Sequence, residues 1–196
     1  MRRRGVRGDG GQVVILYGGL VGLLLFAAFA FFAVAQAGDV RNRGQSAADA
    51  AALAAAQDDR EQLYDGFLDA LEDKDALQDW LDGLGDITGD GCAEADRFAG
   101  RNDADVLSCE QVARNGDDGY TVRIRTRFDT GKTFVPGTGG KKAEASATAV
   151  IKPLCEIDED ADEIEIGCAE EDFTLDPDAD DVEVEPSDLF SVVLVD

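Results

Sequence analysis

Four cysteines are the residues whose spacing constrains the chemistry most: Cys92, Cys109, Cys155 and Cys168. Their number is even and no C-x-x-C spacing occurs, so outside the cytoplasm they predict two disulfides. Of the three possible pairings we favour the sequential one, because it closes the shortest loops. A structural zinc site is the alternative, but the spacings do not fit one and the chain has no histidine.

The lack of histidine also bears on catalysis, because it removes the commonest general base and the serine–histidine and cysteine–histidine pairings of nucleophilic enzymes. Carboxylates are plentiful, yet no feature of the sequence places a pair of them in a cleft. We therefore expect no enzymatic activity, no cofactor and no small-molecule substrate.

Acidic residues dominate the charge of the chain, with 42 Asp and Glu against 18 Lys and Arg and a formal net charge of −24. Residues 1–38 carry +3, so the remainder carries −27. A surface this negative repels phosphates, which excludes nucleic-acid binding. Oxygen donors gather in residues 86–91, 158–163 and 176–181, and such clusters could bind calcium. Since no complete EF-hand spacing occurs, we prefer a solvated acidic surface without a metal.

The N-terminal segment has the length and polarity of a membrane anchor. Residues 13–37 are uncharged and mostly apolar, and as a helix they would span roughly 38 Å against a hydrocarbon core of ~30 Å. Residues 1–12 form a basic tail, so the positive-inside bias places the N-terminus in the cytoplasm and the C-terminal domain outside the cell.

A cleaved signal peptide is the alternative interpretation of this segment. Ala35, Gln36 and Ala37 have the small-x-small form of a cleavage site. We prefer a retained single-pass anchor, because the apolar segment is about twice as long as the apolar region of a typical signal peptide.

A helix is predicted to continue from the membrane through residues 38–85. Alanine, the best helix former, dominates residues 47–56. Leu63, Phe67 and Leu71 then recur at four-residue spacing, and Gly83 and Gly85 end the pattern. These features indicate an Ala-rich stalk followed by an amphipathic helix that packs on the exported domain.

The start of this segment resembles a known family. Residues 41–56 read R-x-R-x-Q-S-A-A-D-A-A-A-L-A-A-A, and with the preceding apolar helix they are similar to TadE/TadG-like proteins of Flp (tight adherence) pilus assembly systems. The resemblance covers about the first 60 residues. The motif residues are Arg41, Arg43, Gln45, Ser46, Ala47, Ala48, Asp49 and Leu53.

The resemblance implies a membrane-anchored, pilin-like or pilus-associated protein without enzymatic activity. Flp pilins and pseudopilins are cut after a glycine, with Glu and then Tyr or Phe at the fifth and sixth positions of the mature chain. If Gly11 were the cleavage site, Tyr17 would fit but Leu16 would stand in place of the Glu. We therefore expect no efficient cleavage after Gly11, as in TadG-like members, which generally keep the anchor uncut.

Residues 86–196 predict an acidic, β-rich extracellular domain. Residues 120–128 alternate between a mostly apolar face and a row of three arginines, and they are predicted to pair with residues 143–154 across the turn 136–140. The row is Arg123, Arg125 and Arg127. It could bind an anion or an acidic partner, but we prefer a solvated face paired with the domain's own carboxylates.

Residues 156–196 contain 18 acidic residues and no Lys or Arg. Apolar pairs recur within this stretch at Ile164 and Ile166, at Phe173 and Leu175 and at Val182 and Val184, before a final apolar run at 189–195. We expect short strands that complete a sheet, and not a disordered tail.

Together these features predict an α+β protein in which a transmembrane helix continues outside the membrane and carries a small, disulfide-stapled antiparallel β domain. The layout resembles that of type IV pilin-like proteins. The expected function is structural, as a membrane-anchored component of an Flp-type pilus assembly or secretion apparatus, with the membrane and other pilus or secretion components as partners. The alternative is an unrelated anchored extracellular module that binds cations or an envelope partner.

Overall fold

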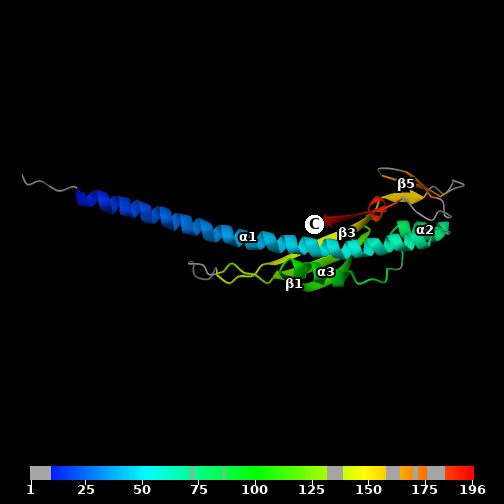
Figure 1. Ribbon diagram of the computed structural model, residues 1–196, viewed down its shortest axis with the longest axis horizontal. Coiled ribbons are helices and arrows are strands. Elements are labelled where there is room, and N and C mark those ends of the chain that lie inside the picture. Colours follow the sequence, from blue (N-terminus) through cyan, green and yellow to red (C-terminus); the bar gives the residue numbers. More distant parts are fainter. Residues whose placement is uncertain are drawn as a thin grey trace, which may run out of the picture.

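One uninterrupted helix, α1 (Gly10–Asp69), is the longest element of the described structure. The computed structural model describes residues 10–71, 73–85, 87–131, 139–157, 164–169, 172–175 and 184–196. In Figure 1 the N-terminal half of α1 projects away from the other elements, and its C-terminal half lies against them. The prediction that the apolar helix continues beyond residue 37 is therefore confirmed.

The structure divides the predicted helix over residues 38–85 into α1 and a second helix, α2 (Lys74–Leu81). Asp73 starts α2, because its Oδ1 accepts a hydrogen bond from the backbone N of Ala76 (3.3 Å) in the manner of a helix N-cap. The turn folds α2 back so that the Trp80 indole covers Gly66 of α1, where a Cβ atom would lie 2.5 Å from the ring. Gly83 follows the end of α2 with φ of 74°, a conformation that glycine adopts without strain.

A four-stranded antiparallel sheet, in the order β1-β2-β3-β7, covers one side of α1. Its strands are β1 (Ala104–Arg114), β2 (Asp117–Thr126), β3 (Glu144–Pro153) and β7 (Phe190–Val195). The predicted hairpin of 120–128 with 143–154 is confirmed as β2 and β3, which pair Tyr120 with Ala149 and Arg125 with Glu144. Of the predicted turn 136–140, only Gly139 and Gly140 lie within the described residues.

Two elements of this layer were not predicted: helix α3 (Gly91–Arg101) and strand β1. Asp90 caps α3, since its side chain accepts a hydrogen bond from the backbone N of Ala93 (3.2 Å). Asn115 and Gly116 join β1 to β2 with positive φ angles of 57° and 99°, as a two-residue hairpin turn requires.

The acidic C-terminal strands do not complete one sheet, as the sequence predicted, but belong to two. Strands β4 (Cys155–Ile157), β5 (Ile164–Cys168) and β6 (Phe173–Leu175) form a separate antiparallel sheet, and β7, which follows the short helix α4 (Pro186–Leu189), joins the main sheet. Pro153 ends β3 at the point where the chain leaves the main sheet, because proline cannot donate to a further ladder bond. Val182 lies outside the described residues.

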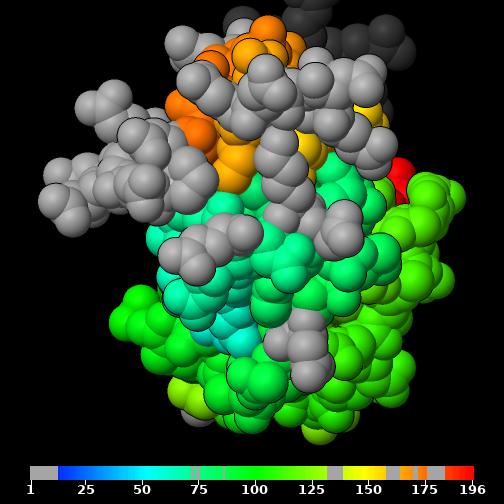
Figure 2. Space-filling model, turned by 90° about the vertical axis from the view of Figure 1, so that its right-hand side faces the viewer, coloured from blue at the N-terminus to red at the C-terminus, as the bar shows by residue number. Residues whose placement is uncertain are grey.

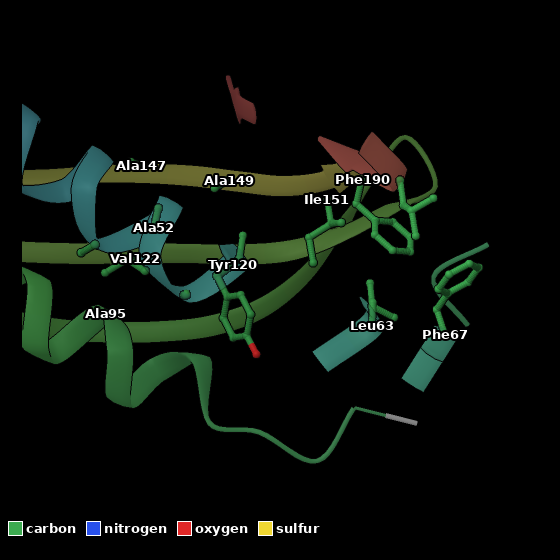
Figure 3. Packing of buried hydrophobic residues seen from close by; sticks show 14 of the residues in the cluster. Ala52, Leu63, Phe67, Ala95, Tyr120, Val122, Ala147, Ala149, Ile151 and Phe190 are labelled. Atoms are coloured by element: carbon green, nitrogen blue, oxygen red, sulfur yellow. The ribbon is translucent and has the colours of Figure 1, made fainter. Parts of the chain in front are cut away.

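Figure 2 shows the end of the molecule farthest from the projecting half of α1, with β5 and β6 on one side of α1 and α2 and with α3 and β1 on the other. The core lies between α1, α3 and the main sheet. Figure 3 shows Ala52 of α1 facing the strands that carry Val122, Ala147 and Ala149, whereas larger side chains fill the space farther along α1. These larger residues include Leu63, Phe67, Ile151 and Phe190.

Candidate functional site

The apolar half of α1 is exposed along its whole length. Its large hydrophobic side chains between Val13 and Val34 have exposed fractions of 49–78%. Among the described residues, α1 is the one helix long and apolar enough to cross a membrane, with a mean hydropathy of 2.5 over a window that is nowhere buried. An apolar surface of this kind is stable in hydrocarbon and costly in water, so this half of α1 is a candidate membrane span.

The Ala-rich half of α1 has the opposite environment, because its alanines form part of the domain's core. Six of them have exposed fractions of 0%: Ala47, Ala48, Ala51, Ala52, Ala55 and Ala56. They face α3 and the small residues of β3, among them Ala147 and Ala149. Because this face of α1 and the alanines of β3 present only methyl groups, the helix can approach that strand closely. The alanines that suggested a stalk therefore pack the helix against the sheet.

The polar residues of the motif lie where α1 meets the edge of the domain. The Gln45 amide donates to Asp49 Oδ1 (2.8 Å) and to the backbone O of Ser146 in β3 (3.3 Å). The Arg43 guanidinium lies 3.9 Å from the centre of the Phe128 ring and 4.0 Å from the Asp39 carboxylate. These contacts tie the helix to the β2–β3 hairpin within a few residues of the exposed apolar half.

The remaining motif residues differ in their exposure. Arg41 and Ser46 are exposed, whereas Leu53 is half-buried and packs against the core. The motif therefore begins where α1 changes from an exposed apolar helix to a buried Ala-rich one.

Residues 11–58 match the Tad family model, described as Flp pilus-assembly TadE/G-like. The resemblance stated from the sequence is confirmed for this segment, which we call the Tad segment and which makes up about a quarter of the chain. No curated protein and no solved structure matches the chain. The Tad segment ends at Asp58, so it contains both the exposed apolar half of α1 and the buried alanines.

Both disulfides form between neighbouring cysteines in the sequence, as favoured above. Cys92–Cys109 joins α3 to β1, with the two Cα atoms 5.7 Å apart. Cys155–Cys168 joins β4 to β5, where the two residues are directly opposite each other in the register. Each bridge fixes an element that lies outside the Tad segment.

A buried carboxyl next to the end of the Tad segment was not predicted from the sequence. Asp59 is 4% exposed and accepts a hydrogen bond from the Tyr120 hydroxyl (3.2 Å), which in turn accepts one from the Gln111 amide (3.0 Å). Burial raises the pKa of Asp59 to about 6, and the nearby charges of Asp58 and Asp118 act in the same direction. Burial likewise raises the pKa of Tyr120 to about 12.

One signal in the sequence could have revealed Asp59. It lies on the same helical stripe as Ala52, Ala56 and Leu63, and a carboxylate on an apolar stripe indicates a buried polar contact. Its partner Tyr120 is 61 residues away, however, and only the fold brings the two together.

The arginine row is paired with the domain's own carboxylates, as preferred above. Arg123 and Arg125 both contact Glu144 on β3 (3.3 and 2.6 Å), and Arg127 contacts Asp105 on β1 (2.7 Å). Hydrogen bonding and the charge of Arg125, followed by Arg123, lower the pKa of Glu144. The row therefore links three strands on the solvent-facing side of the sheet.

The predicted calcium clusters fall mostly on residues that are not described: Asp86, 158–163 and 176–181 lie outside the described ranges. Within the described part of the first cluster, Asp90 serves as the N-cap of α3. Over the described residues, no group of three or more acidic or cysteine side chains is arranged to hold a metal ion.

Proposed function

We propose that this chain is a membrane-anchored structural component of an Flp-type pilus assembly or secretion apparatus. The Tad segment relates the chain to Flp pilus assembly. The apolar half of α1 spans the membrane, with the basic tail in the cytoplasm and the disulfide-bonded domain outside the cell. The role is that of a scaffold without catalytic activity, and its partners are the membrane and other pilus or secretion components.

One observation carries this proposal. The Tad segment is a single helix that changes from exposed and apolar to buried and Ala-rich within residues 37–47, without a break in its hydrogen bonding. Because a helix transmits position and orientation along its axis, a domain built on its second half is held rigidly relative to the membrane. In an anchored module on a flexible linker, the helix would instead be interrupted between its apolar half and its Ala-rich half.

The N-terminus is retained under this proposal. Gly11 lies in the first turn of α1, next to the apolar surface, and Leu16 stands where pilins have the Glu that follows the cleavage glycine. The chain therefore keeps its basic tail, which orients the helix across the membrane.

A deletion and complementation experiment in the source organism tests the function. Deleting the gene should abolish or strongly reduce surface pili counted by electron microscopy, and the full-length gene should restore them. As a matched control, the exported domain is supplied with a cleavable secretory signal in place of residues 1–37, and this form should not restore pili. Unchanged pili in the deletion strain, or full rescue by the secreted form, would contradict the proposal and favour an unrelated extracellular module.

A further inference from the structure

The charge of the exported part is strongly segregated along the sequence. Residues 155–196 carry −18 and residues 58–103 carry −11, whereas residues 104–154, which contain β1, β2 and β3, carry +2. Four exposed cations belong to the two segments that meet where the β2–β3 hairpin contacts the start of the Ala-rich half of α1. We call this group the basic collar, and it consists of Arg41, Arg43, Lys141 and Lys142.

Direct contacts fix the hairpin to α1 at this place. A Cβ atom on Gly44 would lie 3.1 Å from the Cβ of Ala143, and Arg43 stacks on Phe128. Beyond Ala143 the two arms of the hairpin stay paired, since the backbone N of Thr130 donates to the O of Lys141 (3.1 Å). Lys141 and Lys142 are therefore held by backbone hydrogen bonding and do not lie on a free loop.

The direction of β3 shows which way the hairpin points. Ala143 lies beside Gly44, whereas Ala149 pairs with Tyr120, whose hydroxyl reaches Asp59 fifteen residues farther along α1. Residues before Ala143 thus lead back toward the apolar half of α1, and Figure 1 shows the hairpin reaching back in that direction. At ~3.3 Å per strand residue and ~1.5 Å per helix residue, Lys141 is level with about residue 40 of α1.

This position coincides with the lipid headgroups if the apolar half spans the bilayer. The collar lies within roughly 10 Å of residue 37, where the apolar stretch ends, and each headgroup layer is roughly 5–8 Å thick. Among the described residues Arg41, Lys141 and Lys142 form no ion pair, while Arg43 is shared with Asp39. In the described part of the hairpin the nearby carboxylates are Asp129 and Glu144, and Glu144 is already paired with Arg123 and Arg125. The four cations of the collar therefore outnumber Asp39 and Asp129, and the collar keeps a positive excess.

The acidic remainder of the domain does not cancel this attraction. Asp69, at the end of α1, is 32 residues beyond residue 37, which is roughly 48 Å along the helix axis. The Debye length at physiological ionic strength is about 8 Å. Charges at the far end are therefore screened from the membrane surface, whereas those of the collar are not.

We infer that the basic collar binds the anionic phospholipid headgroups of the outer leaflet and so seats the β2–β3 hairpin on the membrane surface. This inference rests on the proposed membrane anchor and adds a second point of attachment to it. Two attachments prevent the domain from rotating about the helix axis, which a single spanning helix allows. The Arg41 and Arg43 positions of the Tad motif thereby gain a role outside the packed core.

Fluorescence quenching in proteoliposomes of the full chain tests the collar. The four native cysteines are all in disulfides, so a fluorophore attaches selectively at Gly139→Cys beside the collar, or at Leu84→Cys at the distal end as a control. The quencher is a lipid with a nitroxide on its headgroup. We expect quenching at Gly139→Cys to be about twofold greater when the vesicles contain about 30 mol% phosphatidylglycerol than in phosphatidylcholine alone, with no difference at Leu84→Cys.

A matched pair of charge variants separates local binding from net charge. Lys141→Glu with Lys142→Glu should abolish the phosphatidylglycerol-dependent increase. Arg114→Glu with Lys152→Glu changes the net charge equally at the other end of the sheet and should leave the increase intact.

Extraction with alkaline carbonate distinguishes the collar from the anchor. One outcome is that the chain resists extraction while quenching is the same in both lipids, or while the two pairs of variants behave alike. Either result would contradict headgroup binding by the collar and leave the membrane anchor supported. If carbonate releases the chain from both kinds of vesicle, the anchor and the collar fall together.

Discussion

At the scale of single residues, Asp59 is the side chain whose environment differs most from its ordinary one. It is an acid within an otherwise apolar helix–sheet contact, and it is held by a tyrosine whose own pKa is raised. Neutral Asp59 fits this site better than the carboxylate does, because burial disfavours charge and two further aspartates lie nearby. We therefore expect the contact between Asp59 of α1 and Tyr120 of β2 to respond to pH.

We predict that Asp59 makes the free energy of unfolding fall as pH rises from about 4 to about 6. The pKa of Asp59 is about 6 in the folded chain, against an ordinary value of 3.8 that applies to the unfolded chain. Between these two values the folded state binds more protons than the unfolded state, and the stabilisation that this provides is lost above about pH 6. A shift of this size corresponds to about 3 kcal/mol at most. Asp59→Asn keeps an acceptor for Tyr120 and should remove this part of the pH dependence.

Denaturant unfolding of the detergent-solubilised full chain, measured from pH 4 to pH 7, checks this prediction. Asp65→Asn, on the exposed side of α1, is the control and should keep the wild-type pH dependence. A slope in Asp59→Asn equal to that of the wild type would show that other carboxylates account for it.

At the scale of elements, the Ala-rich half of α1 shows what the sequence could and could not predict. The run 47–56 predicts a helix from propensity alone, and the helix is there. The same run does not reveal which surface its alanines face, because alanine is as common on a solvated helix as in a tight contact. The burial of Ala51 and Ala52 depends on small residues in β3, about a hundred positions away.

Other elements were not predicted because their sequence signals are short or ambiguous. The Asn115–Gly116 pair marks the β1–β2 hairpin, yet β1 itself is only weakly alternating and has a register shift between Val106 and Ser108. Asp73 and Asp90 are helix caps that resemble any other aspartate in so acidic a chain. The β2–β3 hairpin was predictable because apolar and polar side chains alternate along both strands, as in β2, where Val122 and Ile124 face inward and Arg123 faces outward.

We predict that enlarging a buried alanine of the Tad segment destabilises the domain. Ala52→Leu inserts three carbon atoms between α1 and the sheet and should cost about 1–3 kcal/mol or more. Ser46→Leu adds an apolar side chain at an exposed position of the same motif and should change the unfolding free energy by less than about 0.5 kcal/mol. Thermal unfolding in detergent measures both, and equal destabilisation by the two variants would refute tight packing at Ala52.

At the scale of the whole molecule, charge and shape are arranged along one axis. The apolar half of α1 lies at one end, the basic collar beside it, and the acidic residues of α2 and of the described part of the β4-β5-β6 sheet toward the other end. The sequence predicted the uneven charge and the α+β class, but not that the acidic strands form a second sheet at the distal end. That arrangement depends on where β3 ends and on how β7 returns, which local patterns do not show.

We predict that repulsion among the carboxylates lowers the stability of the folded state. With −27 on the residues after 38, screening should stabilise the folded state, so the full chain in a nonionic detergent should melt at a higher temperature in about 0.5 M NaCl than at low ionic strength. Calcium should raise the melting temperature no more than magnesium does at matched ionic strength. A large rise specific to calcium and saturating at micromolar concentration would instead indicate a true metal site.

Thiol labelling in intact cells tests whether α1 crosses the membrane with its N-terminus in the cytoplasm. Single cysteines are introduced as Arg7→Cys, Leu24→Cys and Ser46→Cys, and a membrane-impermeant maleimide is added before and after permeabilisation. We expect Ser46→Cys to react in intact cells, Arg7→Cys only after permeabilisation, and Leu24→Cys in neither case. A reaction of Arg7→Cys in intact cells, or a membrane-bound chain that has lost the position 7 thiol, would contradict a retained anchor with its N-terminus in the cytoplasm.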